Sequence, residues 1–320
     1  MAKRWEWLDA ETWDAIADQS PGATWFHTRA WSEATAHTDS RYRARGLGLR
    51  LSSGELCLFP LVVRAGALRV GPLGRAVSTQ PGTYGGPLLA ERLLTRADWV
   101  EVLEILGEVP LGRIDCFGNV QDPVPSDLVA RFRPERRSTH VIELGSLPED
   151  PLTTYRSTLR NEIRRSLAAG VTCRPIATDA ELAEYFEVYQ ERLASWGKTP
   201  DKGIPFAMFE FLRAAPGAEI WCAFNADGAV AAGGIFLFTR RHCVWWQGAV
   251  HGDMTKLFPS KALIHHLVGE CRERGLERLD FNPSSGIGGV DGFKRAFRPT
   301  EIEFDTWQHF SPLVSRIKRQ

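Results

Sequence analysis

The sequence lacks the cysteine pairs that would indicate a disulfide framework or a zinc site. Its six cysteines form no CxxC pair, lie far apart and mostly stand within apolar runs: Cys57, Cys116, Cys173, Cys222, Cys243 and Cys271. This spacing fits reduced, buried thiols better than disulfides, and it argues against a structural zinc site. We expect no metal site.

Long hydrophobic runs are also missing. The longest, from Ala229 to Phe238, is too short to span a bilayer. The N-terminal stretch MAKRWEWLDAETWDAIAD carries acids and tryptophans where a signal peptide needs an apolar core. Together with the cysteine pattern, these absences predict a cytoplasmic protein with no membrane span.

The sequence has no net charge that would recruit a partner. Lysine and arginine together number 39, as do aspartate and glutamate, so no bulk field favours DNA or an anionic membrane, although local basic patches remain possible. The 320 residues are 43% hydrophobic and 24% charged. That length and composition fit a soluble globular protein of two ordinary domains or one large one.

Lysine is scarce. Only seven of the 39 basic residues are lysines, yet Lys256, Lys261 and Lys294 all fall between Trp245 and Phe304. Chance on a GC-rich coding background explains this as well as a local need for a compact, flexible point charge does.

Hydrophobic periodicity predicts alternating helices and strands in two similar halves. In the first half we expect helices at 13–18, from Thr28 and at 96–106, and strands at 45–51, 55–63, 112–118 and 139–144. The order recurs as a helix at 181–190, strands at 220–224, 230–239 and 243–247, a helix at 260–274 and a strand at 278–281. Two weakly similar halves are the simplest account, and we place them at 1–145 and 146–320.

Between the halves, the sequence pattern predicts one helix at residues 150–170. Asp150 can cap it, Pro151 fits its first turn and Gly170 fits the position after its end. Its expected apolar stripe consists of Leu152, Tyr155, Leu159, Ile163 and Leu167. A basic ridge on another face consists of Arg156, Arg160 and Arg164, with Arg165 beside them. The ridge suits phosphates, although a solvated helix face is the commoner meaning of such a pattern.

The stretch from Trp245 to Phe304 is where we expect the active site. It reads as a strand, a basic loop, an amphipathic helix, a second strand, a glycine-rich loop, a Phe-Lys segment and a last strand. The first N–H groups of a helix are unpaired and point outward, so a loop that opens onto a helix can hold an anionic ligand.

Six segments of the chain together resemble the FemAB family. They are TWFHTRAW, LFPLVV, YGGPL, LRNEIRRSLAAGV, FPSKALIHHLV and the LDF…G…FKRAF ending, and they run through most of the chain. FemAB proteins are tandem acyltransferases with a GNAT-like fold that add amino acids to peptidoglycan precursors; related GNAT proteins occur in polysaccharide clusters. The resemblance implies an α/β (α+β) fold of two tandem GNAT-like domains, each a mixed central sheet flanked by helices.

The resemblance also implies direct transfer of an acyl group to an amine, with no covalent enzyme intermediate. Residues 146–320 would hold the donor and catalyse the reaction, and residues 1–145 would lie on the acceptor side. In this family the lysine of the Phe-Lys pair is thought to lie near the developing charge of the tetrahedral intermediate, and here that pair is Phe293-Lys294. A positive charge at that point can contribute several kcal/mol.

The proton of the attacking amine also needs an acceptor. Asp280 is our candidate, although Arg278-Leu279-Asp280 matches Arg113-Ile114-Asp115 in the first half, so Asp280 is also consistent with a structural residue at a strand end. Other titratable groups nearby in the sequence are His251, Asp253 and Asp291. No spacing singles out one of them.

The expected binding residues fall into two groups. For the donor they are Gln247 and Gly248, on a strand that would expose N–H groups to the donor carbonyl, and Lys256, Ser260 and Lys261, which could meet phosphates. For the acceptor they are Trp31, Tyr84, Gly85, Arg160 and Arg164.

Two departures from the family pattern bear on the ligands. Acetyl-CoA-dependent GNAT enzymes carry a glycine-containing loop before this helix, whereas this chain has KLFPSK, in which Pro259 removes a donor. Coenzyme A is therefore less favoured. No basic residue follows Trp31, where Glu33, Ala34 and Thr35 stand, which argues against a UDP-muropeptide acceptor.

The function that we predict is transfer of an acyl or aminoacyl group to an amine acceptor, such as a cell-wall or polysaccharide precursor. We expect no tightly bound cofactor, and either aminoacyl-tRNA or acyl-CoA as co-substrate. One alternative is an acyl-CoA-dependent N-acetyltransferase acting on an amino sugar or another small amine. The other is a degenerate tandem fold that binds a peptide or glycan without catalysis.

Overall fold

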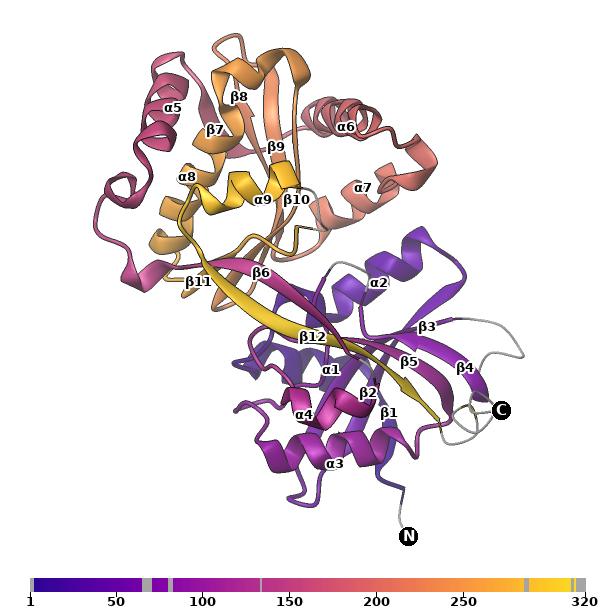
Figure 1. Cartoon of the computed structure of the whole chain (residues 1–320). Helices are drawn as coiled ribbons and strands as arrows, with labels where there is room; N and C mark the ends of the chain where they lie inside the picture. Colours follow the sequence, from indigo (N-terminus) through magenta and orange to yellow (C-terminus); the bar gives the residue numbers. More distant parts are fainter. Residues whose placement is uncertain are drawn as a thin grey trace. The chain divides into compact units, whose positions relative to one another are not determined.

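The chain folds into two compact units, each with its own set of strands and helices (Figure 1). The computed structural model describes residues 3–64, 71–79, 83–132, 134–284, 288–311 and 314. Of these, the residues up to Ser138 and those from Ile302 onwards form unit 1, and Thr139–Glu301 form unit 2. The chain therefore passes between the units twice, and its last strand lies in unit 1 rather than in the second half, where we expected it.

The sheet of unit 1 is mixed. Its strands, in order across the sheet, are β1 (Trp5–Leu8), β2 (Tyr42–Arg50), β3 (Leu56–Arg64), β4 (Gly71–Val77), β5 (Leu111–Phe117) and β12 (Thr300–Phe310). β4 and β5 run parallel, and the other neighbours run antiparallel. β12 belongs here because its residues Thr306 to Phe310 pair with β5, which would otherwise be an edge of this sheet.

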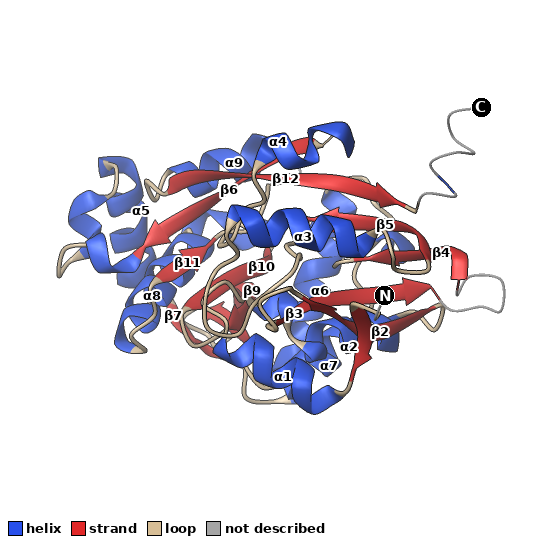
Figure 2. Ribbon diagram, turned by 90° about the horizontal axis from the view of Figure 1, so that it is seen from below, coloured by secondary structure: helices blue, strands red, loops and turns tan. Residues whose placement is uncertain are grey.

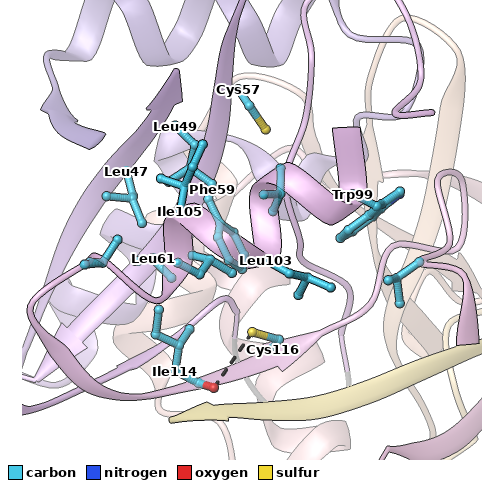
Figure 3. Close-up of a cluster of buried hydrophobic side chains, with 14 of the residues drawn as sticks. Leu47, Leu49, Cys57, Phe59, Leu61, Trp99, Leu103, Ile105, Ile114 and Cys116 are labelled. Atoms are coloured by element: carbon cyan, nitrogen blue, oxygen red, sulfur yellow. Dashed lines mark hydrogen bonds between the residues drawn. The ribbon is translucent and has the colours of Figure 1, made fainter. Parts of the chain in front are cut away.

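Helices cover both faces of the unit 1 sheet (Figure 2). They are α1 (Ala10–Gln19), η1 (Trp25–His27), α2 (Arg29–Thr38), α3 (Arg96–Leu106), α4 (Ser126–Val129) and η2 (Ala130–Phe132). Side chains alternate along β3, so Phe59 lies in the same buried cluster as Trp99 and Leu103 of α3 (Figure 3). Leu58, on the other face, packs with Trp13 of α1. Each such side chain contributes about 1.5–3 kcal/mol when fully buried.

The sheet of unit 2 is also mixed. Its strands are, in order, β6 (Glu135–Glu143, which begins in unit 1), β11 (Arg278–Asp280), β10 (His242–Val250), β9 (Val230–Phe238), β8 (Ala218–Phe224) and β7 (Thr172–Pro175). β10 and β11 run parallel, and the other neighbours run antiparallel. Both units therefore have the predicted architecture of a mixed sheet flanked by helices.

The two faces of the unit 2 sheet carry different helices (Figure 1). The helical segments are η3 (Leu144–Ser146), η4 (Pro151–Thr154), α5 (Ser157–Ala168), α6 (Asp179–Ser195), η5 (Pro200–Lys202), α7 (Phe206–Ala214), η6 (Gly252–Leu257), α8 (Pro259–Glu273) and α9 (Gly288–Arg295). Ala232 of β9 packs with Leu263 of α8. The next residue, Gly233, faces Tyr185 of α6, and a Cβ there would lie 2.5 Å from the tyrosine ring.

The predicted helix at 150–170 is wrong in one respect, because the chain breaks it near the start. Asp150 accepts a hydrogen bond from Leu152 N–H as predicted, and Gly170 has φ +79. Tyr155 and Arg156 are extended, with ψ of 155 and 146, so the short turn η4 is separated from α5. The extended backbone buries the Tyr155 ring against Phe297 and His265.

Two further expectations about side-chain placement can be compared with the structure. All six cysteines are free thiols, five of them buried and Cys173 half-buried. Leu167, expected in the apolar stripe of the 150–170 helix, is 49% exposed and is not part of the core. Within the described ranges, none of the helices combines the length and apolar character that crossing a membrane requires.

Candidate active site

Strands β10 and β11 separate at the point where the sequence places the site. Their parallel ladder joins His242–Val244 to Arg278–Asp280, whereas β10 continues to Val250. β10 also has a bulge between Trp245 and Gln247 in its ladder with β9. In open α/β sheets, ligands bind beyond the carboxyl ends of such strands.

Lys294 is the principal charged group beside the end of β11. Its side chain comes from α9, is only 3% exposed, and donates from Nζ to the backbone carbonyl of Asn282 at 2.6 Å. Burial lowers the pKa of Lys294 to about 8, against the opposing attraction of Asp280 and Asp291. The ammonium form therefore still predominates at neutral pH.

Phe293 helps to hold α9 in this position. Its half-buried ring packs 5.7 Å from that of Trp245 on β10 and 5.5 Å from that of Phe297. These contacts tie the segment that carries Lys294 to the strand that leaves the ladder.

Asp280 lies at the end of β11 and fixes the turn that follows. It is 1% exposed, and its Oδ1 accepts from Thr139 Oγ1 and from Asn282 N–H, each at 2.7 Å. Asn282 adopts the left-handed backbone conformation, φ +56, which asparagine tolerates better than most residues. These bonds agree with the interpretation of Asp280 as a structural residue. Asp280 also attracts the ammonium of Lys294 electrostatically.

A second polar pair, His140 and Asp291, lies in the same unit. His140 is on β6, beside Thr139, and is 3% exposed; its carbonyl accepts from Phe281 N–H at 2.9 Å. Its Nε2 is buried, lies 3.7 Å from Asp291 Oδ1, and has no hydrogen-bond partner in the part of the chain that the structure describes. Asp291 Oδ2 accepts from Arg295 Nε at 2.7 Å.

The sequence did not single out His140. It lies about 150 residues from Asp291 in the chain, and only the β6–β11 pairing brings it to α9. The predicted strand at 139–144 was the one available signal, because it contains a histidine beside a hydroxyl residue.

The expected donor-binding residues on β10 are half-buried. Tyr185 of α6 donates its hydroxyl hydrogen to Gln247 Oε1, which fixes the amide of Gln247. Trp245 Nε1 donates to the Gln247 carbonyl at 2.7 Å. At Gly248 a Cβ would overlap the Trp245 ring, so a larger residue does not fit there without movement of the indole.

The start of α8 offers fewer anion-binding groups than a glycine-rich loop would. Lys256 is exposed on η6 and Ser260 is half-buried. The Lys261 ammonium is 2.5 Å from Glu162 Oε2. The N–H groups of Lys261 and Ala262 both donate to the carbonyl of Phe258, at 3.0 and 3.3 Å.

The expected acceptor residues are divided between the units. In unit 1, Trp31 and Tyr84 are fully buried, and Trp31 Nε1 donates to Thr79 Oγ1 at 2.9 Å. Gly85 lies against Ser78, whose Oγ would be 2.6 Å from an added Cβ. In unit 2, the half-buried Arg160 and the exposed Arg164 lie one turn apart on α5, whereas Arg156 precedes the helix.

The described residues contain no group of three or more histidine, cysteine, aspartate or glutamate side chains that could hold a metal ion.

Part of the sequence matches a known protein family, and the structure is similar to several solved structures. A family described as "Acetyltransferase (GNAT) domain" matches residues 153–295, from η4 to the end of α9. Residues 153–295 therefore resemble a GNAT domain. The separated strands β10 and β11 and the Phe293-Lys294 pair all lie within this matched segment. No curated protein matches the sequence.

Solved structures extend the likeness beyond the GNAT domain to almost the whole chain. FemX has a TM-score of 0.72 at 12% identity, over 98% of this chain and 99% of that chain. L-PGS from Bacillus licheniformis has a TM-score of 0.58 at 15% identity, over 98% and 97%. A conserved protein of unknown function from Bacteroides thetaiotaomicron has a TM-score of 0.59 at 12% identity, over 95% and 97%. The predicted FemAB-like tandem GNAT fold is thereby confirmed.

Proposed function

We propose that the protein is an N-acyltransferase that moves an acyl or aminoacyl group directly from its carrier to an amine. The observation that carries this proposal is the buried ammonium of Lys294, which is directed at a backbone carbonyl just beyond the end of β11 in a GNAT domain. A buried charge is costly to maintain, and such groups occur where they serve chemistry.

In the proposed reaction the amine attacks the acyl carbonyl, and negative charge develops on its oxygen. Lys294 supplies the positive charge that stabilises this oxygen, while the hydrogen bonds of Asp280 hold the turn at Asn282. Removing one such electrostatic contact costs roughly 10²–10³ in rate. A cysteine nucleophile is not favoured at Cys173, because burial raises the pKa of this thiol to about 12.

For the donor we propose aminoacyl-tRNA first and acyl-CoA second. Pro259 has no N–H, two further N–H groups at the start of α8 are directed to Phe258, and Lys261 is paired with Glu162. These contacts leave few groups for a pyrophosphate. The acyl-CoA alternative is supported by the acetyltransferase (GNAT) match and by the exposed Lys256. For the acceptor we propose an amine on a cell-wall or polysaccharide precursor, as the FemAB resemblance implies.

A turnover assay with both donor classes tests the activity. Labelled aminoacyl-tRNA or acyl-CoA is incubated with amine acceptors and either the wild-type chain, Lys294→Ala or Lys202→Ala. Lys202 is an exposed lysine on η5 and serves as the matched control. We expect a loss of roughly 10²-fold or more for Lys294→Ala alone. Wild-type turnover by Lys294→Ala would contradict the mechanism, and no product with either donor would favour the non-catalytic alternative.

Thermal protection tests the donor, because a specific ligand stabilises the folded state by mass action. Acetyl-CoA and a non-hydrolysable aminoacyl-tRNA mimic are each added to the wild type and to the Lys256→Ala/Lys261→Ala double variant. Protection by the tRNA mimic alone supports aminoacyl transfer. If acetyl-CoA protects the wild type but not the double variant, acyl-CoA replaces aminoacyl-tRNA as the proposed donor.

A further inference from the structure

With the ring proton of His140 on Nδ1, its Nε2 and the Oδ1 of Asp291 are two acceptor atoms at a separation that suits one nitrogen between them. Nε2 and Oδ1 are 3.7 Å apart, too far for a hydrogen bond with each other. A nitrogen at ordinary hydrogen-bond lengths of about 2.9 Å can reach both atoms at once. A primary amine has the two N–H groups needed to donate one hydrogen to each.

The surroundings hold both atoms in place. Backbone pairing of β6 with β11 fixes His140, and the bond from Arg295 fixes Asp291 through its other oxygen. The Asp291 side chain is 37% exposed, so solvent reaches the pair from this side. The buried Nε2 of His140 has no hydrogen-bond partner within the described part of the chain, so it is available to accept a hydrogen bond from a ligand.

Lys294 lies three residues after Asp291 on α9, and residues at this spacing share one face of a helix. An amine held by His140 and Asp291 is therefore next to the charge that would stabilise the oxygen of an acyl group. One turn of α9 would then hold the attacking amine through Asp291 and stabilise the developing negative charge through Lys294.

We propose that His140 removes the proton of the attacking amine and that Asp291 is the second acceptor that holds this amine, an inference that rests on the proposed acyl-transfer function. The amine nitrogen forms a bond to the acyl carbon and gives one proton to His140 Nε2. The bond from that carbon to the carrier oxygen or sulfur then breaks. The departing atom takes the proton from the imidazolium, which restores His140 and leaves an amide and a free carrier.

The electrostatic environment agrees with this role. Burial lowers the pKa of His140, so the ring is neutral at pH 7 and can accept a proton. Asp291 and Glu301 raise this pKa, while Arg295 and Lys294 lower it. These groups come from α9 and from the start of β12.

The first test is the pH profile of kcat/KM for the wild type and His140→Gln, with methoxyamine as acceptor. Methoxyamine is so weakly basic that its own ionisation does not shape the profile near neutrality. Loss of general-base catalysis should lower kcat/KM by roughly 10²–10⁴-fold and remove the rising limb on the acidic side. Wild-type kcat/KM and an unchanged limb in His140→Gln would overturn the proposal.

Two substitutions on α9 test His140 without removing it. Asp291→Asn removes a charge that raises the pKa of His140, so the rising limb should move to lower pH. Arg295→Gln removes a charge that lowers this pKa, so the limb should move to higher pH. Shifts in opposite directions are not expected from a general loss of folding. Two unmoved limbs would refute the role of His140.

Nuclear magnetic resonance of the eight histidines separates this inference from the proposed function. The His140 signal is assigned by its loss in His140→Gln, and methoxyamine is added to the chain without a donor. A shift of this signal that weakens in Asp291→Asn supports the amine site even if no acyl transfer is found. Acyl transfer without any such shift at saturating amine would leave the function standing and reject the amine site.

Discussion

Replacing Lys294 by methionine should change how the stability of the protein depends on pH. The pKa of Lys294 is lowered from 10.5 to about 8, first because of burial. Between these two pH values the unfolded chain binds the proton and the folded chain does not. Above the pKa that Lys294 has in the unfolded chain, its burial does not lower the free energy of unfolding. As pH falls through the pKa that Lys294 has in the folded chain, the buried charge lowers the free energy of unfolding by its full amount.

The size of the effect follows from the two pKa values. A depression from 10.5 to about 8 corresponds to roughly 3 kcal/mol at pH 7. About 2 kcal/mol of this should be recovered between pH 7 and about pH 9.5, where most of the unfolded lysine is still charged. Methionine has no proton to lose, so Lys294→Met lacks this dependence.

The measurement is the difference in unfolding free energy between the wild type and Lys294→Met, from urea titrations at both pH values. Groups that titrate in both proteins cancel in this difference, as does any constant change in packing. The exposed Lys202→Met variant controls for loss of a lysine and should stay within about 0.5 kcal/mol of the wild type at each pH.

The outcome separates burial of a charge from other roles of the side chain. The difference should move by about 2 kcal/mol in favour of the wild type as pH rises. If the units unfold separately, this change belongs to the transition of unit 2, which contains Lys294. A difference that stays constant between the two pH values would show that Lys294 does not pay a desolvation cost in the folded state, and the reasoning would fail.

Three further predictions concern how single residues affect the stability of the two units. Burial raises the pKa of Asp122 to about 6, so its stabilising contribution, present below the unfolded pKa near 3.8, is lost as pH rises through 6; relative to Asp122→Asn, urea titrations should show a loss of roughly 2 kcal/mol between pH 4 and 7. Tyr185→Phe removes the hydroxyl that donates to the side-chain amide of Gln247 and should lower the free energy of unfolding, measured with denaturant, by about 1 kcal/mol. No loss would mean that this hydrogen bond makes no net contribution to stability. Gly233→Ala forces a Cβ to 2.5 Å from the tyrosine ring and should lower stability by about 1–3 kcal/mol, whereas Gly269→Ala, with open space in α8, should raise it by up to about 1 kcal/mol; equal melting shifts for the two alanines would contradict the packing described here.

Local patterns predicted the elements well because the signal lies within each element. The helix at 96–106 has the predicted bounds, since its apolar residues recur at helical spacing. One apolar residue of this helix, Val100, is nevertheless 41% exposed. The break at Tyr155 was missed because the contacts that favour it come from residues more than 100 positions away in the chain.

In the candidate site, Phe293, Lys294 and Asp280 were expected from the sequence, and their roles stay predictions. The Phe293-Lys294 pair was found through a family resemblance, and the structure shows why a charge there is unusual: it is almost fully buried. Strand pairing brings His140 close to Asp291 on α9, and no spacing within the sequence predicts this pairing. The return of β12 to β5 is likewise a long-range pairing.

The return of β12 also constrains the order in which the protein can mature on the ribosome. The chain emerges from its N-terminus, so the strands β1 to β5 are made long before their last partner, which ends at Phe310. At ordinary rates of synthesis the whole of unit 2 takes on the order of ten seconds to appear. Throughout that interval β5 presents an open edge to other nascent chains. All residues of unit 2 have been made before β12 is complete, so the unit whose synthesis begins first is the last to receive its final strand.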